Sequence, residues 1–275
     1  MALLSCRQSA AKFSVLISIG LSIASVRVFP QVPLPQSQSS SPTRHDSVDV
    51  VEHSTPEEVE EGKLNDVYEA TAQQQRNGPC TQEIIRRYQS AVIPAAEKAA
   101  FNVPRNKFLF LANRDIGNCY LGQQKFAEAE ASFQEILQYA PVWPGTDDSA
   151  YPINFRQIAT AQMGQQHWAA AEQSLLKSIA LFEPLISAAE KSEAIFTLNY
   201  RGSHARSYAL LAVVYFREGR VQDALHAVEK AYDEVTKYNL DPQYRNEVEN
   251  IGKAIANASG DSAAERVWSQ RGPAK

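Results

Sequence analysis

The stretch that decides the fold is Phe110–Trp143, FLANRDIGNCYLGQQKFAEAEASFQEILQYAPVW. Apolar residues at helical spacing lie before and after a polar break at 122–125, and Pro141 follows the second run. This spacing predicts two helices joined by a tight turn. Small residues at Gly117 and Ala129 favour close crossing of the two helices, because a larger side chain would push the backbones apart.

The same spacing occurs twice more along the chain. With Ala129 as the reference, the equivalent residues are Ala171 and Ala224, and the three are separated by 42 and 53 residues. In each window a small residue lies twelve positions before the reference alanine and an apolar residue lies four positions after it: Gly117 and Phe133, Ala159 and Leu175, Ala212 and Val228. The sequence therefore predicts three copies of one helical hairpin.

This pattern resembles the tetratricopeptide repeat (TPR), a helix-turn-helix unit of 34 residues. The repeats span about 110–143, 152–185 and 205–238, with insertions of 8 and 19 residues between the reference alanines relative to that period. The copies depart from the family pattern at Asn113 and Gln162, where the other windows have aromatic residues. The resemblance implies an all-α, right-handed superhelical solenoid with N-terminal helices and a C-terminal capping helix.

Further helices are predicted on both sides of the three repeats. One spans 57–76, where Thr55-Pro56-Glu57-Glu58 is typical of a helix start, and another spans 81–100 with a kink at Pro94. The second helix of repeat two is expected to continue through 187–194, followed by a break at 199–203. Asp241-Pro242 opens a capping helix to about 258, and a short helix at 262–270 carries Trp268, which is expected to be a core plug, with an exposed contact as the alternative.

The first 26 residues are typical of an export signal. Arg7 and Lys12 precede the apolar run Phe13–Ala24, which is short for a membrane span. Cleavage, retention as an anchor, and a mitochondrial presequence are the alternatives that the residues leave open. Residues 27–61, rich in Pro, Ser and Gln, are predicted to be a disordered linker that is either a tail or a spacer from a membrane, and 62–275 to be the helical domain.

Composition and motifs argue against several classes of function. The net charge of −4 argues against a nucleic-acid binder, which usually carries a basic excess. None of the five histidines has metal-ligand spacing, and no phosphate-binding loop or nucleophile motif is present, so we expect no catalytic residue, metal or cofactor. His204, in the insertion near Arg201 and Arg206, is the one histidine that an enzymatic alternative would use.

Two cysteines follow the predicted signal. In an oxidising compartment Cys80 and Cys119 form a candidate disulfide, and the alternative for Cys119 is a core thiol inside the first helix of repeat one.

The resemblance also implies a binding surface, since the first helix of each repeat lines a concave groove that holds a peptide or a partner helix. Matching positions in this chain are Arg114, Asn118, Leu121, Arg156, Thr160, Met163, Arg206, Val213 and Arg217. Arginines favour carboxylates, so an acidic or mixed polar peptide is the expected partner, unless these arginines pair with acids on neighbouring helices. Arg114 and Asn118 match the carboxylate-clamp type of the family, but Leu210 replaces its basic residue.

We therefore expect an exported scaffold or adaptor, periplasmic or secreted, that binds a protein partner, does not bind nucleic acid, and meets a membrane only through an uncleaved N-terminal segment. The alternatives are an accessory or assembly factor of an envelope complex, and an α-helical enzyme that uses the insertion at 187–203.

Overall fold

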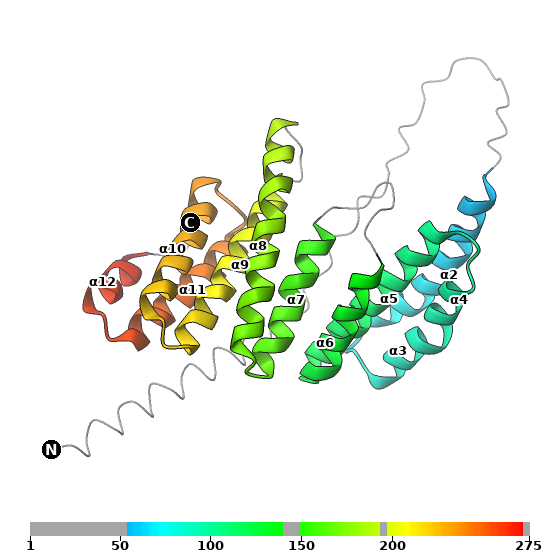
Figure 1. Cartoon of the computed structure of the whole chain (residues 1–275), viewed down its shortest axis with the longest axis horizontal. Helices are drawn as coiled ribbons and strands as arrows, with labels where there is room; N and C mark the ends of the chain where they lie inside the picture. Colours follow the sequence, from blue (N-terminus) through cyan, green and yellow to red (C-terminus); the bar gives the residue numbers. More distant parts are fainter. Residues whose placement is uncertain (1–53, 140–148, 193–196, 272–275) are drawn as a thin grey trace.

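The computed structural model describes residues 54–139, 149–192 and 197–271, and these three ranges contain helices and no β-strand (Figure 1). The predicted all-α class is confirmed. The predicted export signal, the linker as far as His53 and most of the loop at 144–149 lie outside the described residues. Within the described residues, no helix combines the length and the apolar character that a membrane crossing requires.

The described helices form five hairpins that follow one another in a stack (Figure 1). We call the first helix of each hairpin its A helix and the second its B helix. In chain order the hairpins are α2 (Pro56–Arg76) with α3 (Gln82–Arg87), a π-helical turn (Tyr88–Val92) and α4 (Ile93–Glu97); α5 (Asn102–Gly122) with α6 (Phe126–Glu135); α7 (Ala150–Gly164) with α8 (Trp168–Lys191); α9 (Thr197–Arg217) with α10 (Val221–Lys237); and α11 (Pro242–Ser259) with α12 (Ser262–Gln270).

Close crossing at small residues holds the two helices of a hairpin together. In the second hairpin, a Cβ atom added to Gly117 would lie 2.5 Å from the Phe133 ring, so only glycine leaves room for this phenylalanine. The fifth hairpin repeats the arrangement, because a Cβ atom added to Gly252 would lie 2.3 Å from the ring of Trp268. Trp268 is 2% exposed, which confirms its predicted role as a core plug.

The predicted capping helix is thus half of a further hairpin. Ile251, Gly252, Ala264 and Trp268 have the same spacing as Ile116, Gly117, Ala129 and Phe133. α12 packs on α11 as the B helix of this hairpin, and its Trp268 ring lies against Tyr232 of α10. The hairpin therefore continues the stack and covers the apolar face of the fourth hairpin.

Side-chain caps fix where the outer helices begin. Thr55 is the N-cap of α2 and forms a capping box with Glu58, while Asp241 is the N-cap of α11 and accepts a hydrogen bond from the backbone of Gln243. Both predicted helix starts are confirmed. α2 begins at Pro56, so the folded region starts before residue 62.

The predicted helix at 81–100 is divided by a π-helical turn just before Pro94. Proline lacks a backbone donor and crowds the preceding turn, and a wider π turn relieves both problems.

The predicted break at 199–203 is wrong, because these residues lie within α9. Gly202 serves close packing here, since a Cβ atom at this position would lie 2.5 Å from the ring of Tyr244 on α11. The expected continuation of the second helix of repeat two is confirmed as far as Lys191, the last residue of α8.

Candidate partner-binding surface

The side chains predicted to bind a partner lie on three consecutive A helices. We call the partly exposed members of this set the A-helix surface: Arg114, Asn118 and Leu121 of α5, Arg156, Thr160 and Met163 of α7, and Arg206 and Arg217 of α9. Val213 is not part of it, because its side chain is 6% exposed and packs in the core of the last two hairpins. The resemblance correctly predicted that Val213 lies on an A helix, but its side chain faces the core and not the predicted groove.

At least one polar bridge joins each successive pair of A helices. Tyr68 of α2 donates to Asp115 of α5 at 2.6 Å, and Gln157 of α7 donates to Asn118 of α5 at 2.8 Å. The third bridge runs from Arg156 of α7 to the backbone carbonyl of Ser203 on α9, at 3.0 Å. The fourth joins Arg206 of α9 to Glu247 of α11, also at 3.0 Å. These bridges fix the spacing and register of the A helices along the stack.

Arg114 belongs to a buried network. Its Nε donates to Asp115 at 3.0 Å, and Asp115 also accepts hydrogen bonds from Tyr68 and Tyr88. Burial raises the pKa of both tyrosine hydroxyls, and the Asp115 charge raises it further, so they remain protonated donors. Burial opposes the charge of Arg114, but Asp115 more than offsets this and raises the arginine pKa. Arg114 thus has an acidic partner, but on its own helix and not on a neighbouring helix as the ion-pair alternative expected.

Arg156 differs from the other arginines of the A-helix surface. Its guanidinium donates to the carbonyl of Ser203, and no carboxylate of the described residues pairs with it. Burial lowers the pKa of Arg156 to about 10, and the nearby positive charge of Arg206 lowers it as well, with Tyr244 and Glu247 acting in the opposite direction. Arg156 is therefore a partly buried cation whose charge is incompletely compensated.

Three further members of the A-helix surface, Thr160, Met163 and Arg217, lie near backbone or apolar groups of the fold. The guanidinium of Arg217 lies 5.7 Å from the centre of the Trp168 ring, and burial lowers the pKa of this arginine. Thr160 donates to the carbonyl of Arg156 one turn earlier in α7, and Met163 packs against the core clusters on both sides of it. Apolar and cationic side chains thus alternate along this surface.

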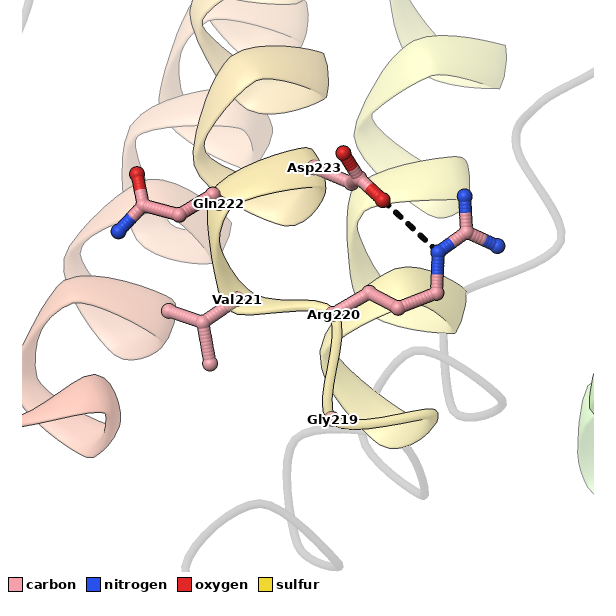
Figure 2. Close-up of a pocket in the computed structure, with 5 residues that line it drawn as sticks. All are labelled: Gly219, Arg220, Val221, Gln222 and Asp223. Atoms are coloured by element: carbon pink, nitrogen blue, oxygen red, sulfur yellow. Dashed lines mark hydrogen bonds and ion pairs between the residues drawn. The ribbon is translucent and has the colours of Figure 1, made fainter.

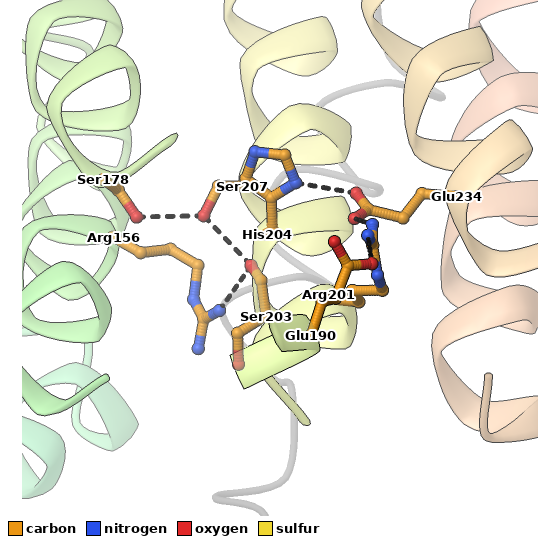
Figure 3. A network of polar contacts seen from close by, with 8 residues as sticks. All are labelled: Arg156, Ser178, Glu190, Arg201, Ser203, His204, Ser207 and Glu234. Carbon is orange, nitrogen blue, oxygen red and sulfur yellow. Dashed lines mark hydrogen bonds and ion pairs between the residues drawn. The ribbon is translucent and has the colours of Figure 1, made fainter. Parts of the chain in front are cut away.

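The histidine singled out from the sequence lies in an ion-pair cluster between α9 and α10 (Figure 3). His204 Nδ1 lies 2.7 Å from one carboxylate oxygen of Glu234, and Arg201 donates to the other oxygen at 3.0 Å. Arg201 also pairs with Glu190 at the end of α8. The edges of Phe182 and Tyr208 enclose the imidazole, and its Nε2 is buried without a hydrogen-bond partner in the described residues. This cluster joins α8, α9 and α10.

An open depression lies at the turn between α9 and α10 and is lined by Gly219–Asp223 (Figure 2). Arg220 there donates to Asp223 at 2.8 Å and pairs with Glu172 and Glu218. Its charge is therefore already balanced within the turn. The described residues contain no group of three or more histidine, cysteine or acidic side chains placed to hold a metal ion.

The two candidate cysteines come together between the first and second hairpins. Cys80 and Cys119 have Cα atoms 5.2 Å apart, within the range that a disulfide spans, and their sulfur atoms are in bonding contact. Cys119 is 1% exposed. The side-chain amide of Gln123 donates to the Cys80 carbonyl at 3.0 Å, which holds the segment before α3 against the end of α5.

Comparison with known proteins supports the fold alone. No family model matches the chain, and no curated protein matches it. Among solved structures, the chain is similar to a point variant of a Podosopora anserina putative kinesin light chain with nearly identical TPR-like repeats, with a TM-score of 0.55 and 16% sequence identity over 79% of this chain and 94% of that chain. A second structure of a Podosopora anserina putative kinesin light chain with such repeats gives a TM-score of 0.51 and 15% identity over 76% of this chain and 93% of that chain.

These similarities and the repeated register of the hairpins lead to one conclusion. The chain has the TPR-like fold, a stack of helical hairpins without strands in its described part.

Proposed function

We propose that this chain is an exported interaction scaffold that binds an extended peptide or a partner helix on its A-helix surface. The observation that carries the proposal is the row of partly exposed side chains on α5, α7 and α9, held in register by the bridges from α5 to α7 and from α7 to α9. A preorganised surface of this kind loses little conformational entropy when a partner binds.

Site-specific photo-crosslinking tests where the partner binds. The photoreactive amino acid benzoylphenylalanine is placed at Leu121 or Thr160 on the A-helix surface, or at the exposed Gln173 on the B helix α8 as the control. After irradiation in an extract of the native cells, adducts are identified by mass spectrometry. We expect the same protein to be captured from positions 121 and 160 and not from 173. Capture from position 173 alone would contradict the proposal.

The export part of the proposal rests on the first 26 residues of the sequence, with their positive start and apolar run. An accessory role in an envelope complex would use the same surface for one dedicated partner. Cell fractionation with N-terminal sequencing of the mature protein tests export. A full-length chain in the cytosolic fraction would contradict it.

A further inference from the structure

Arg156, Arg206 and Glu247 form a charge cluster across three consecutive A helices. Arg206 donates to Glu247 at 3.0 Å, and both side chains are largely buried, at 13% and 17% exposed. Arg156 lies close enough for its charge to act on Arg206 and to be acted on by Glu247. Glu247 thus pairs with Arg206, whereas Arg156 donates to a neutral backbone carbonyl.

The cluster is held in place before any ligand binds. The Ser203 carbonyl accepts from Arg156 and from the Ser207 hydroxyl, and Ser207 lies 3.0 Å from Ser178, as Figure 3 shows. Ser178 in turn donates to the Pro152 carbonyl at 2.8 Å. The two hydroxyls carry one proton each, so two of the three contacts that they make are hydrogen bonds at any moment. Together the contacts tie α7, α8 and α9 to one another around the carbonyl that holds the Arg156 side chain. Arg156 is partly exposed as a residue, and its guanidinium nitrogens are not among the buried polar atoms without a partner, so the group keeps some solvent access.

The geometry points to Arg156 as a carboxylate receptor: we propose that it binds an Asp or Glu side chain within the partner peptide. The positive charge of Arg206 adds electrostatic attraction for the same carboxylate. This inference rests on the proposed function and names the chemistry of its ligand. Guanidinium groups bind carboxylates through paired, charge-assisted hydrogen bonds, and a partly buried cation gains most from such a partner. A terminal carboxylate fits less well, because the position where the clamp type has a basic residue is Leu210, which is 3% exposed.

A selection with random peptides tests the inference. The full chain is immobilised, and a phage library of random twelve-residue peptides is selected against the wild type, Arg156→Gln, Arg156→Lys and Arg86→Gln. Arg86 is the matched control, since it is exposed on α3 and pairs with Glu83 on the same helix. We expect Asp and Glu to be enriched at one peptide position by the wild type and by Arg86→Gln, and this enrichment to be lost with Arg156→Gln.

Affinity measurements with the leading synthetic peptide then isolate the pair. A neutral Gln or Asn at the enriched position should weaken binding to the wild type by about 10- to 100-fold, as expected for a charge-assisted hydrogen bond, and should have no effect on Arg156→Gln. Arg156→Lys should recover part of the loss, because it keeps the charge but not the fork of donors. Amidating the peptide terminus should leave affinity unchanged.

The outcomes separate the two proposals. If the wild type enriches no peptide, the proposed peptide-binding function fails and the inference falls with it. If the wild type and Arg156→Gln bind the same peptide equally, or if amidation removes binding, only the inference is overturned.

Discussion

The hydroxyl of Tyr68 lies 2.6 Å from the Asp115 carboxylate, and this hydrogen bond joins the first A helix to the second. Asp115 is 1% exposed and also accepts from Tyr88 and Arg114. A buried carboxylate surrounded by three donors satisfies them all at one point. The first two hairpins therefore share a polar core in addition to their apolar contacts.

Replacing Asp115 with Ala should destabilise the protein by about 3–5 kcal/mol, because Arg114 and two buried hydroxyls lose their common acceptor. Tyr68→Phe removes one of these donors and should cost about 1.5–3 kcal/mol, the usual value for a hydrogen bond to a charged group. Tyr120→Phe is the control, since Tyr120 is partly exposed and has a lysine over its ring, a contact that phenylalanine keeps. Urea unfolding measures all three. Equal stability of Asp115→Ala and the wild type would contradict the network.

Gly117 tests the close crossing of α5 and α6. A Cβ atom there would meet the Phe133 ring at 2.5 Å, so Gly117→Ala should cost about 1–3 kcal/mol through overpacking. Gly62 in α2 has no atom within 4 Å of an added Cβ, and Gly62→Ala should stabilise by about 0.5–1 kcal/mol through helix propensity. In thermal unfolding, Gly117→Ala should lower the unfolding temperature and Gly62→Ala should raise it. These opposite signs distinguish the effect of packing from the effect of helix propensity. Phe133→Leu should relieve part of the Gly117→Ala cost.

Glu60 gives the first two hairpins a pH dependence. Its carboxylate accepts from the backbone amides of Ala100 and Phe101 just before α5, and these hydrogen bonds lower its pKa from the ordinary value of 4.5. A lowered folded-state pKa stabilises the protein above 4.5, and this contribution is lost as the pH falls through the folded-state value. Glu60→Gln should therefore lower the unfolding temperature at pH 7, and the difference from the wild type should shrink at pH 3. A difference that is constant between these pH values would contradict the assignment.

The disulfide between Cys80 and Cys119 stays a prediction that mass mapping checks. Peptide digests of the unreduced exported protein should contain the two cysteine peptides linked. The pair lies 39 residues apart in sequence, and closing such a loop stabilises by roughly 2–4 kcal/mol, so reduction should lower the unfolding temperature. Complete alkylation of both thiols in the native, unreduced protein would show that they do not pair.

The sequence predicted the three central hairpins because small and apolar residues keep one spacing in each copy. The same spacing in Ile251, Gly252, Ala264 and Trp268 marks the fifth hairpin, and applying the register there would have found it. The first hairpin departs from this spacing, since Ile84 takes the place of the reference alanine and a π turn interrupts the second helix.

Other features depend on contacts between distant residues, which spacing does not show. Gly202 looks like a helix break in the sequence, but the ring of Tyr244 on another hairpin requires its missing side chain. The arginines of the A-helix surface were all candidates for binding acids. Only the fold shows that Arg114 and Arg206 each have a carboxylate partner, whereas Arg156 is held by the backbone of Ser203.

This difference between Arg156 and Arg206 predicts that replacing Arg206, but not Arg156, destabilises the protein. Burial and the neighbouring Arg206 lower the pKa of Arg156 to about 10, so the charged guanidinium is less favourable in the folded state than in the unfolded chain. Arg156→Met keeps the aliphatic stem and removes the charge, so we expect an unfolding temperature equal to or above that of the wild type. Arg206→Met leaves Glu247 largely buried without its partner and should cost about 1–3 kcal/mol. Unchanged or increased stability on replacement is the result expected for a residue that binds a ligand at the expense of stability. Equal losses in both variants would instead make Arg156 a structural residue.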